Sequence, residues 1–191
     1  MMSAKDMDIN VRLTKQLLRC KINKKLKTQK EEDRNRKSGS IQKKLFRTNL
    51  FKRAKVVMIF ISFGGEVHTK EMIEKARKLG KIVTVPVCRA NRTIRPAIFS
   101  QGSRLTSGLY EIWEPAIKNF VRLEDLDLVV VPAVALDKKG NRLGRGKGYY
   151  DRFLAKLGPR TFSVGLAFNF QILPSIPTTN EDKRVDKVIF A

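Results

Sequence analysis

The first helical pattern of the chain lies near its start. Between residues 9 and 27 the apolar positions Val11, Leu18, Ile22 and Leu26 recur at helical spacing, and lysines and arginines fill the other faces. A capping-box pattern from Thr28 to residue 31 predicts that a second, more polar helix begins there and runs to about residue 46. We therefore expect two basic helices to precede the rest of the fold.

Continuous apolar runs rich in β-branched residues predict the strands. Residues 56–61 form one such run, residues 69–79 follow with a helical pattern that Gly80 ends, and residues 81–87 form a second run. Strand, helix and strand at this spacing make a βαβ unit, which favours a parallel sheet. Further runs predict strands at residues 128–131, 162–168 and 187–190. The fold class expected is α/β, three layers, with a mostly parallel sheet and helices on both faces.

One domain, residues 1–191, is the natural organisation for a chain of this length, because no internal repeat or low-complexity linker divides it. Residues 1–47 would pack as helices on an α/β core of residues 55–191. The stretch 88–124 has weaker patterns: a short strand at 94–99, interrupted by Pro96, and another at 110–113. Trp113 in the latter is expected to be a core residue.

Charge narrows the possible partners. Forty basic and eighteen acidic residues give a formal charge of +22, which favours nucleotides, phosphates, polycarboxylates, nucleic acid or anionic membranes. No apolar run approaches the roughly 18 residues of a membrane span, and the first residues have no apolar signal core, so we expect a cytoplasmic protein.

The cysteines and the histidine limit the metal chemistry. Cys20 and Cys88 lack CxxC spacing and suit reduced thiols. With His68 the single histidine, multi-histidine metal sites are excluded, and Mg²⁺ is the metal to expect.

The densest candidate chemistry follows the run at 128–131. After a polar turn come Gly144, Gly146 and Gly148, interleaved with basic residues, and then a helical pattern from residue 149 to 157. Glycines let backbone N–H groups approach an oxyanion, and a helix start adds unpaired donors. The pattern is neither a P-loop nor a dinucleotide fingerprint, because Asn141 and Tyr149 occupy positions where those motifs need glycine. It favours phosphate binding over a flexible, solvated turn.

The run GNRLGRGKGYYD, residues 140–151, resembles the signature of the 5-formyltetrahydrofolate cyclo-ligase family, also called methenyltetrahydrofolate synthetases. Other pieces of the family pattern occur in the family's order, so the resemblance covers nearly the whole chain. They are Lys15-x-x-Leu18-Arg19, the run SFGGE at residues 62–66, Glu114-Pro115, Asp182 and Asp186. One departure is Glu181, since the family often has histidine before the first of these aspartates.

The resemblance implies an ATP-dependent closure of 5-formyltetrahydrofolate to 5,10-methenyltetrahydrofolate, with release of ADP and phosphate. It assigns catalysis to Arg145 and Lys147, and it implies Mg²⁺ on Asp151 and Asp182. It implies folate contacts at Ile61, Glu66 and Tyr149, with Phe63 adding apolar contact. The ATP contacts that it implies are Lys15, Arg19, Arg142, Leu143, Gly144, Arg145, Gly146, Lys147, Gly148, Tyr149 and Tyr150.

Several of these residues also have plain structural interpretations. Lys15 and Arg19 could lie on a solvated helix face, Glu66 could be a carboxylate that leads a helix, and Asp151 could be an acid favoured by the helix dipole. Two other functions stay open from the residues alone: a basic nucleic-acid-binding module, and a sugar-phosphate isomerase or acyl-transferase relative. We expect a monomer without membrane contact, and a basic rim of Arg89, Arg92 and Arg95 that holds a polyglutamate tail on the folate.

Overall fold

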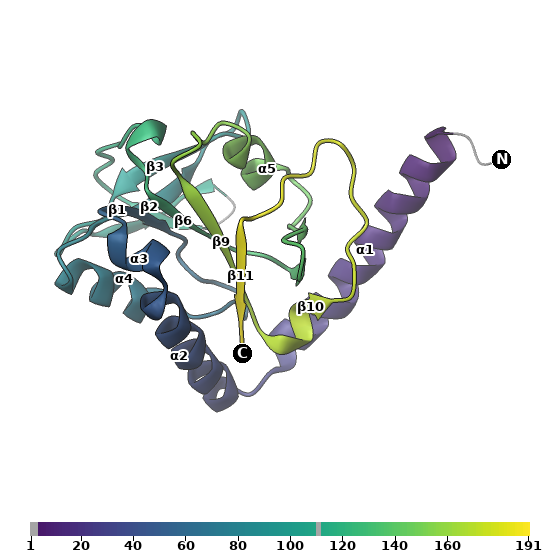
Figure 1. Ribbon diagram of the computed structural model, residues 1–191, viewed down its shortest axis with the longest axis horizontal. Coiled ribbons are helices and arrows are strands. Elements are labelled where there is room, and N and C mark those ends of the chain that lie inside the picture. The colour runs from purple at the N-terminus through teal and green to yellow at the C-terminus, as the bar shows by residue number, and fades with distance from the viewer. Residues whose placement is uncertain (1–3, 110–111) are drawn as a thin grey trace.

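The centre of the computed structural model, which describes residues 4–109 and 112–191, is a six-stranded sheet (Figure 1). Its strand order is β11-β9-β6-β1-β2-β3, and every neighbouring pair is parallel except β2 and β3. The strands are β1 (Val56–Ile59), β2 (Ile82–Cys88), β3 (Ile94–Ile98), β6 (Leu128–Val131), β9 (Phe162–Ala167) and β11 (Lys187–Phe190). The predicted mostly parallel α/β sheet is confirmed, and all six of its strands were expected.

The strands read as apolar runs because both faces of the sheet are covered. Leu128 and Val130 pack into a core beneath the N-terminal helices, whereas Val129 and Val131 pack against Tyr149 and other residues on the opposite face. All four residues of β6 are fully buried. A fully buried strand has no polar face, so its sequence shows no alternation.

Four helices cover one face and one short helix covers the other. The first group is α1 (Ala4–Thr28), α2 (Glu31–Arg47), α3 (Asn49–Arg53) and α4 (Lys70–Lys78), and the opposite face carries α5 (Tyr149–Leu154). The helix predicted at residues 149–157 is therefore shorter than expected. Two 3₁₀ turns, Leu123–Asp125 and Asn169–Gln171, lie in the connections. None of the helices described has the length and apolarity to cross a bilayer.

The junction between α1 and α2 differs from the predicted capping box. Thr28 ends α1 and donates its hydroxyl hydrogen to the carbonyl of Lys24, and Lys30 precedes α2 without a side-chain cap. α2 nevertheless begins at Glu31, where three acidic residues in its first turn interact favourably with the positive end of the helix dipole. The second helix is present, but it begins at Glu31 and not directly after Thr28, and the capping mechanism predicted for it was wrong.

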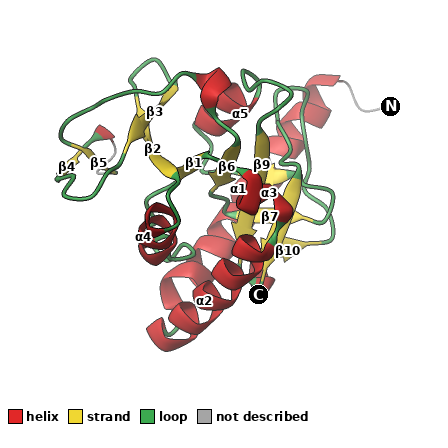
Figure 2. Cartoon of the chain, turned by 60° about the vertical axis from the view of Figure 1, so that its left-hand side comes forward, coloured by secondary structure: helices red, strands yellow, loops and turns green. Residues whose placement is uncertain are grey.

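Two small sheets were not predicted. Between β6 and the glycine loop the chain forms a hairpin of β7 (Ala135–Asp137) and β8 (Arg142–Leu143), which β10 (Ile172–Leu173) extends. Buried Asp137 builds the turn, since its carboxylate accepts the backbone N–H groups of Lys139 and Asn141. Figure 2 shows the second small sheet, β4 (Leu105–Ser107) with β5 (Trp113–Pro115), standing away from the main sheet.

The position of β5 corrects the expectation for Trp113. This residue is 50% exposed, not part of the core, because the two-stranded ribbon leaves its face uncovered. The strand expected at 110–113 begins at Trp113, and Tyr110 lies outside the described residues.

Candidate active site

A pocket of about 1060 Å³ lies at the carboxyl ends of β1, β2 and β6. After β1 the chain adds β2 on one side of it and later β6 on the other, so the strand order switches direction between β1 and β6. Open α/β sheets bind ligands at this kind of position. The pocket takes its walls from α1, from the loop after β1, from the segment between β8 and α5, and from residues 179–183.

The structure brings every residue predicted for the site to this pocket. Among the residues lining it are Lys15, Arg19, Ile61, Phe63, Glu66, Arg142, Leu143, Gly144, Arg145, Gly146, Lys147, Gly148, Tyr149, Tyr150, Asp151 and Asp182. These positions come from four separate segments of the chain. The fold therefore brings all of these residues together around one pocket.

The glycine loop is shaped by its backbone conformation. Gly146 has a φ of +95° and Gly148 a φ of +69°, which residues with a side chain rarely adopt. α5, which follows, has only six residues, so its dipole is small and the positive charge of the loop must come from side chains. Arg19 contributes from α1, where its Nε donates to the carbonyl oxygen of Gly144 at 2.8 Å.

α1 turns Lys15 and Arg19 inward, so the solvated-face interpretation is wrong for these two residues. Lys15 is buried and its Nζ lies 2.5 Å from Oδ2 of Asp182. Burial would raise the pKa of Asp182, but hydrogen bonds from Lys15 and from Thr179 bring it below its ordinary value. Burial lowers the pKa of Arg19, and the charges of Asp182 and Asp151 oppose that shift. Asp182 is thus held as an anion between the helix and the glycine loop.

The opposite wall is built around Glu66, in the loop after β1. Glu66 is 6% exposed, accepts the backbone N–H of Phe63, and pairs with Nη2 of Arg145 at 2.8 Å. Burial raises the pKa of this carboxyl group, and the charge of Arg145 is the main opposing influence. The guanidinium of Arg145 also lies over the Phe63 ring, 4.2 Å from its centroid. Arg145 of the glycine loop therefore covers both the carboxylate of Glu66 and the ring face of Phe63 on the other wall.

Two buried polar atoms in the pocket have no hydrogen-bond partner among the described residues: Nε of Arg142 and the hydroxyl of Tyr150. Such atoms are rare in native proteins and point to a group that the fold itself does not supply. Burial also raises the pKa of Tyr150 well above its ordinary value, so this hydroxyl stays protonated. The neighbouring Tyr149 differs, since its hydroxyl donates to the carbonyl of Arg89 at 2.9 Å.

The two carboxylates predicted to hold Mg²⁺ suit a hard cation. The described hydrogen bonds of Asp151, from Arg142 and from the backbone of Lys183, both fall on Oδ1, and those of Asp182 all fall on Oδ2. Each carboxylate thus keeps a second oxygen for an ion. Residues 4–109 and 112–191 hold no cluster of three or more His, Cys, Asp or Glu, so phosphate oxygens and water would supply the other ligands, as Mg²⁺ prefers.

Several pocket residues were missed from the sequence. Arg12 lies one helical turn before Lys15, so the inward face of α1 could have revealed it. Cys88 ends β2, and a strand's carboxyl end was a signal available from the sequence. Trp113 and Lys183 gave no such signal, because their place in the wall depends on the β4–β5 ribbon and on a long loop.

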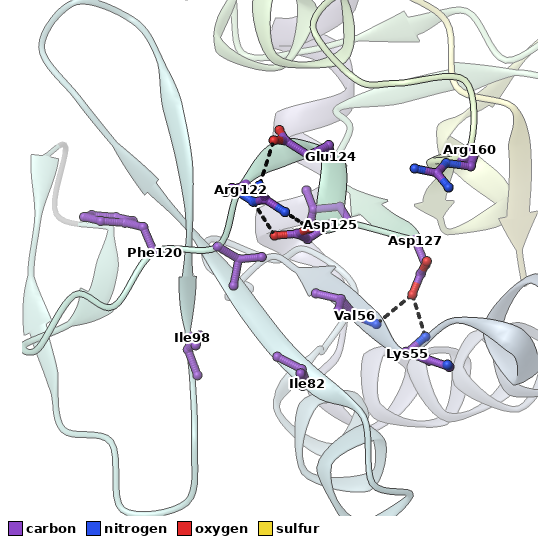
Figure 3. A pocket seen from close by; sticks show the side chains of 12 residues that line it. Lys55, Val56, Ile82, Ile98, Phe120, Arg122, Glu124, Asp125, Asp127 and Arg160 are labelled. Atoms are coloured by element: carbon purple, nitrogen blue, oxygen red, sulfur yellow. Dashed lines mark hydrogen bonds and ion pairs between the residues drawn. The ribbon is translucent and has the colours of Figure 1, made fainter.

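A second cavity, of about 600 Å³, lies at the opposite edge of the sheet, near the first residues of β1 and β2 (Figure 3). Two of its carboxylates pair with groups close to them in space: Asp127 accepts the backbone N–H groups of Lys55 and Val56, and Asp125 pairs with Arg122 at 2.9 Å. It lacks a glycine-rich loop and any of the predicted site residues. These contacts are structural, which leaves the carboxyl-end pocket as the candidate active site.

Comparison with known proteins decides the family. The model of the 5-formyltetrahydrofolate cyclo-ligase family matches residues 11–191. This chain belongs to that family. The predicted resemblance is confirmed, and it makes the chain a ligase of one-carbon metabolism that converts 5-formyltetrahydrofolate to 5,10-methenyltetrahydrofolate.

Cyclo-ligases from distant organisms resemble the chain over most of its length. A 5-formyltetrahydrofolate cyclo-ligase of Mus musculus is 32% identical over 95% of this chain and 96% of its own. One from Haemophilus influenzae is 35% identical over 69% of this chain and 73% of its own. The solved structure of 5,10-methenyltetrahydrofolate synthetase from Aquifex aeolicus superimposes with a TM-score of 0.82 at 32% identity, covering 92% of this chain and 89% of that one. These similarities favour the ligase over the nucleic-acid-binding module and the isomerase or acyl-transferase.

Proposed function

We propose that the cyclo-ligase reaction of this chain proceeds by transfer of the γ-phosphoryl group of ATP to the formyl oxygen of the folate. The formyl oxygen attacks the γ-phosphorus and ADP leaves. The N10 amine then closes on the activated formyl carbon, and phosphate leaves and takes up the proton of that amine. The observation that carries this proposal is one pocket with a basic glycine loop on one wall and buried Glu66 on the other, joined by the Arg145–Glu66 ion pair.

The glycine-loop wall would bind ATP. Phosphoryl transfer requires mainly positioning and neutralisation of charge, and this wall combines loop N–H groups with Lys15, Arg19 and Arg142. Mg²⁺ held by Asp151 and Asp182 would neutralise the phosphate oxygens. The unpaired Nε of Arg142 and the hydroxyl of Tyr150 would complete their hydrogen bonds with bound ligand or water.

Arg145 and Lys147 would carry the catalytic charge, since both lie in the loop between the two walls. A cation that contacts the transferred phosphoryl group stabilises charge that builds up in the transition state. No nucleophilic side chain or general base is needed, because the formyl oxygen is the attacking group. Catalysis would therefore rest on charge and geometry.

The Glu66 wall would bind the folate. Pterin ring N–H groups suit a buried carboxylate acceptor, while Ile61, Phe63 and Tyr149 offer apolar surface beside it. Arg145 now pairs with Glu66 and covers Phe63. Nucleotide phosphates would draw Arg145 away and leave the carboxylate to the pterin.

A polyglutamate tail on the folate remains a proposal for the basic segment after β2. The guanidinium groups of Arg89 and Arg95 stack over Phe120, at 5.4 and 3.8 Å from the ring centroid, and the carbonyl of Arg89 holds Tyr149 of the pocket. The mono- and polyglutamylated substrates should differ in KM at low salt, and equal values would contradict this proposal.

A monomeric state, a cytoplasmic location and one domain from residue 1 to 191 also stay predictions.

The direct test is spectroscopic. Protein, Mg-ATP and 5-formyltetrahydrofolate should together produce the near-ultraviolet band of the methenyl product, with one ADP formed per product. Omission of ATP or addition of a chelator should abolish the band. A band without ADP release would contradict the phosphoryl-transfer mechanism. A gel shift with nucleic acid that weakens steeply with salt would instead support the alternative function.

A further inference from the structure

The junction of α1 and α2 holds the loop that carries Glu66 through hydrogen bonds to the backbone of that loop. Gln29, in the turn between them, donates from Nε2 to the carbonyl oxygens of Gly65, at 2.7 Å, and Leu26, at 3.1 Å. A Cβ at Gly65 would lie 2.2 Å from the Leu26 oxygen, so the close approach requires glycine there. The next carbonyl, that of Glu66 itself, accepts from Nε of Arg34 at 2.9 Å.

Arg34 is unusual among the basic residues of α2. Its side chain is 15% exposed and pairs with Glu31 of the same helix as well as with the loop, whereas that of Arg36, two residues on, is 73% exposed and pairs only with Asp33 of its own helix among the described residues. α2 also holds the segment after Glu66, since the hydroxyl of Ser38 accepts the backbone N–H of His68. This half-buried arginine therefore belongs to a set of contacts between α2 and the folate-side loop.

We propose that Arg34 is a positioning residue for the folate substrate, which fixes the backbone of Glu66 and keeps a positive charge behind its carboxylate when Arg145 turns to the nucleotide. This inference rests on the proposed role of Glu66 in binding the pterin. Arg34 lines the outside of the loop and is not among the residues of the pocket. It acts on the substrate only through Glu66.

The charges around Glu66 explain when Arg34 matters. Arg145 faces the carboxylate from the glycine loop, Tyr150 faces it from α5, the N–H of Phe63 donates to it, and Arg34 acts from α2. Burial raises the pKa of Glu66, and Arg145 and, more weakly, Arg34 oppose that shift. Once Arg145 contacts phosphate, Arg34 is the cation that remains among those the structure places near Glu66.

Steady-state kinetics of the full-length enzyme tests the proposal. Arg34→Ala should raise KM for 5-formyltetrahydrofolate about tenfold, the order expected for one lost charge-assisted hydrogen bond, while KM for ATP and kcat change less than about twofold. Glu66 binds as an anion, so kcat/KM for folate falls as pH drops through its pKa. Without the cation that pKa is higher, and the acid limb of the profile should move to higher pH.

Three further variants separate the possible causes. Arg34→Lys should recover most of the folate KM and of the pH profile, and Arg34→Gln, which keeps a donor but no charge, should recover the KM better than the pH profile. Arg36→Ala should behave as wild type. Melting temperatures of all four proteins show whether each is folded, and the Lys and Gln variants carry the test if the Ala variant does not fold.

An unchanged folate KM and an unmoved acid limb in Arg34→Ala would overturn the proposal while wild-type turnover still supports the proposed function. Equal losses toward ATP and folate would also overturn it, because a general structural role predicts that pattern. If the wild-type protein itself forms no methenyl product, that result contradicts the proposed function, whatever the Arg34 variants show. The two failures are therefore distinguishable.

Discussion

The two cavities at opposite edges of the sheet contain similar side chains and use them differently. At the amino-end edge, carboxylates pair with groups close to them in the fold, as Asp125 does with Arg122 three residues away. At the carboxyl-end edge the pairs line an open pocket and join side chains to side chains: Lys15 with Asp182, Glu66 with Arg145, and Arg142 with Asp151. That pocket also holds the two unpaired buried atoms. Carboxylates that hold backbone or a neighbouring turn serve the fold, whereas ion pairs that line an open pocket can be exchanged for a ligand.

Asp151→Asn should give the largest effect if this distinction is right. The amide keeps an oxygen to accept from Arg142 and Lys183 but loses the charge that binds Mg²⁺, so the melting temperature should hold while Mg²⁺-dependent turnover falls at least about 100-fold. Turnover and its Mg²⁺ dependence measure this. Asp125→Asn in the other cavity is the matched control and should keep full activity. Wild-type turnover in Asp151→Asn would remove this residue from the site.

Lys147→Ala should lower kcat and raise KM for ATP together, with kcat/KM for ATP reduced about 10- to 100-fold. The physical reason is that a cation beside the transferred phosphoryl group interacts more strongly as charge builds up. KM for the folate should change little, because Lys147 lies in the glycine-loop wall. Lys138→Ala, an exposed lysine of the β7–β8 turn, is the control. An unaltered kcat with an unaltered KM for ATP would contradict the assignment.

The Arg145–Glu66 pair predicts coupling between the two substrates. A non-hydrolysable ATP analogue should tighten 5-formyltetrahydrofolate binding about three- to tenfold, because phosphates draw Arg145 from Glu66 and from the Phe63 ring. Calorimetric titration with and without the analogue measures the coupling. Arg145→Ala should abolish it. Independent binding of the two ligands by the wild-type protein would mean that the ion pair persists when the nucleotide is bound.

The sequence predicted the glycine-loop wall well because its chemistry is contiguous: residues 140–151 are recognisable as a motif wherever the loop lies. It predicted central strands such as β1, β6 and β9 because a parallel strand that is buried on both faces must be apolar nearly throughout. It could not predict the partners of Lys15 and Asp182, since helical spacing tells which residues share a face but not what that face meets. The exposed Trp113, the β7–β8 hairpin and the half-buried Arg34 depend in the same way on tertiary contacts.

Asp127→Ala should show the smallest functional effect, because the amino-end cavity is structural. Asp127 accepts the backbone N–H groups of Lys55 and Val56, at 2.7 and 2.9 Å, and so joins the start of β1 to the start of β6. Losing two such bonds near the surface should lower the free energy of unfolding by about 1–2 kcal/mol, measured by urea denaturation. The kinetic constants should stay within about twofold of wild type. Asp127→Asn, which keeps an acceptor oxygen, should lose less stability. Should turnover fall in Asp127→Ala while the unfolding curve stays in place, the amino-end cavity would take part in the reaction, and a carboxylate bonded to backbone there would no longer count as structural.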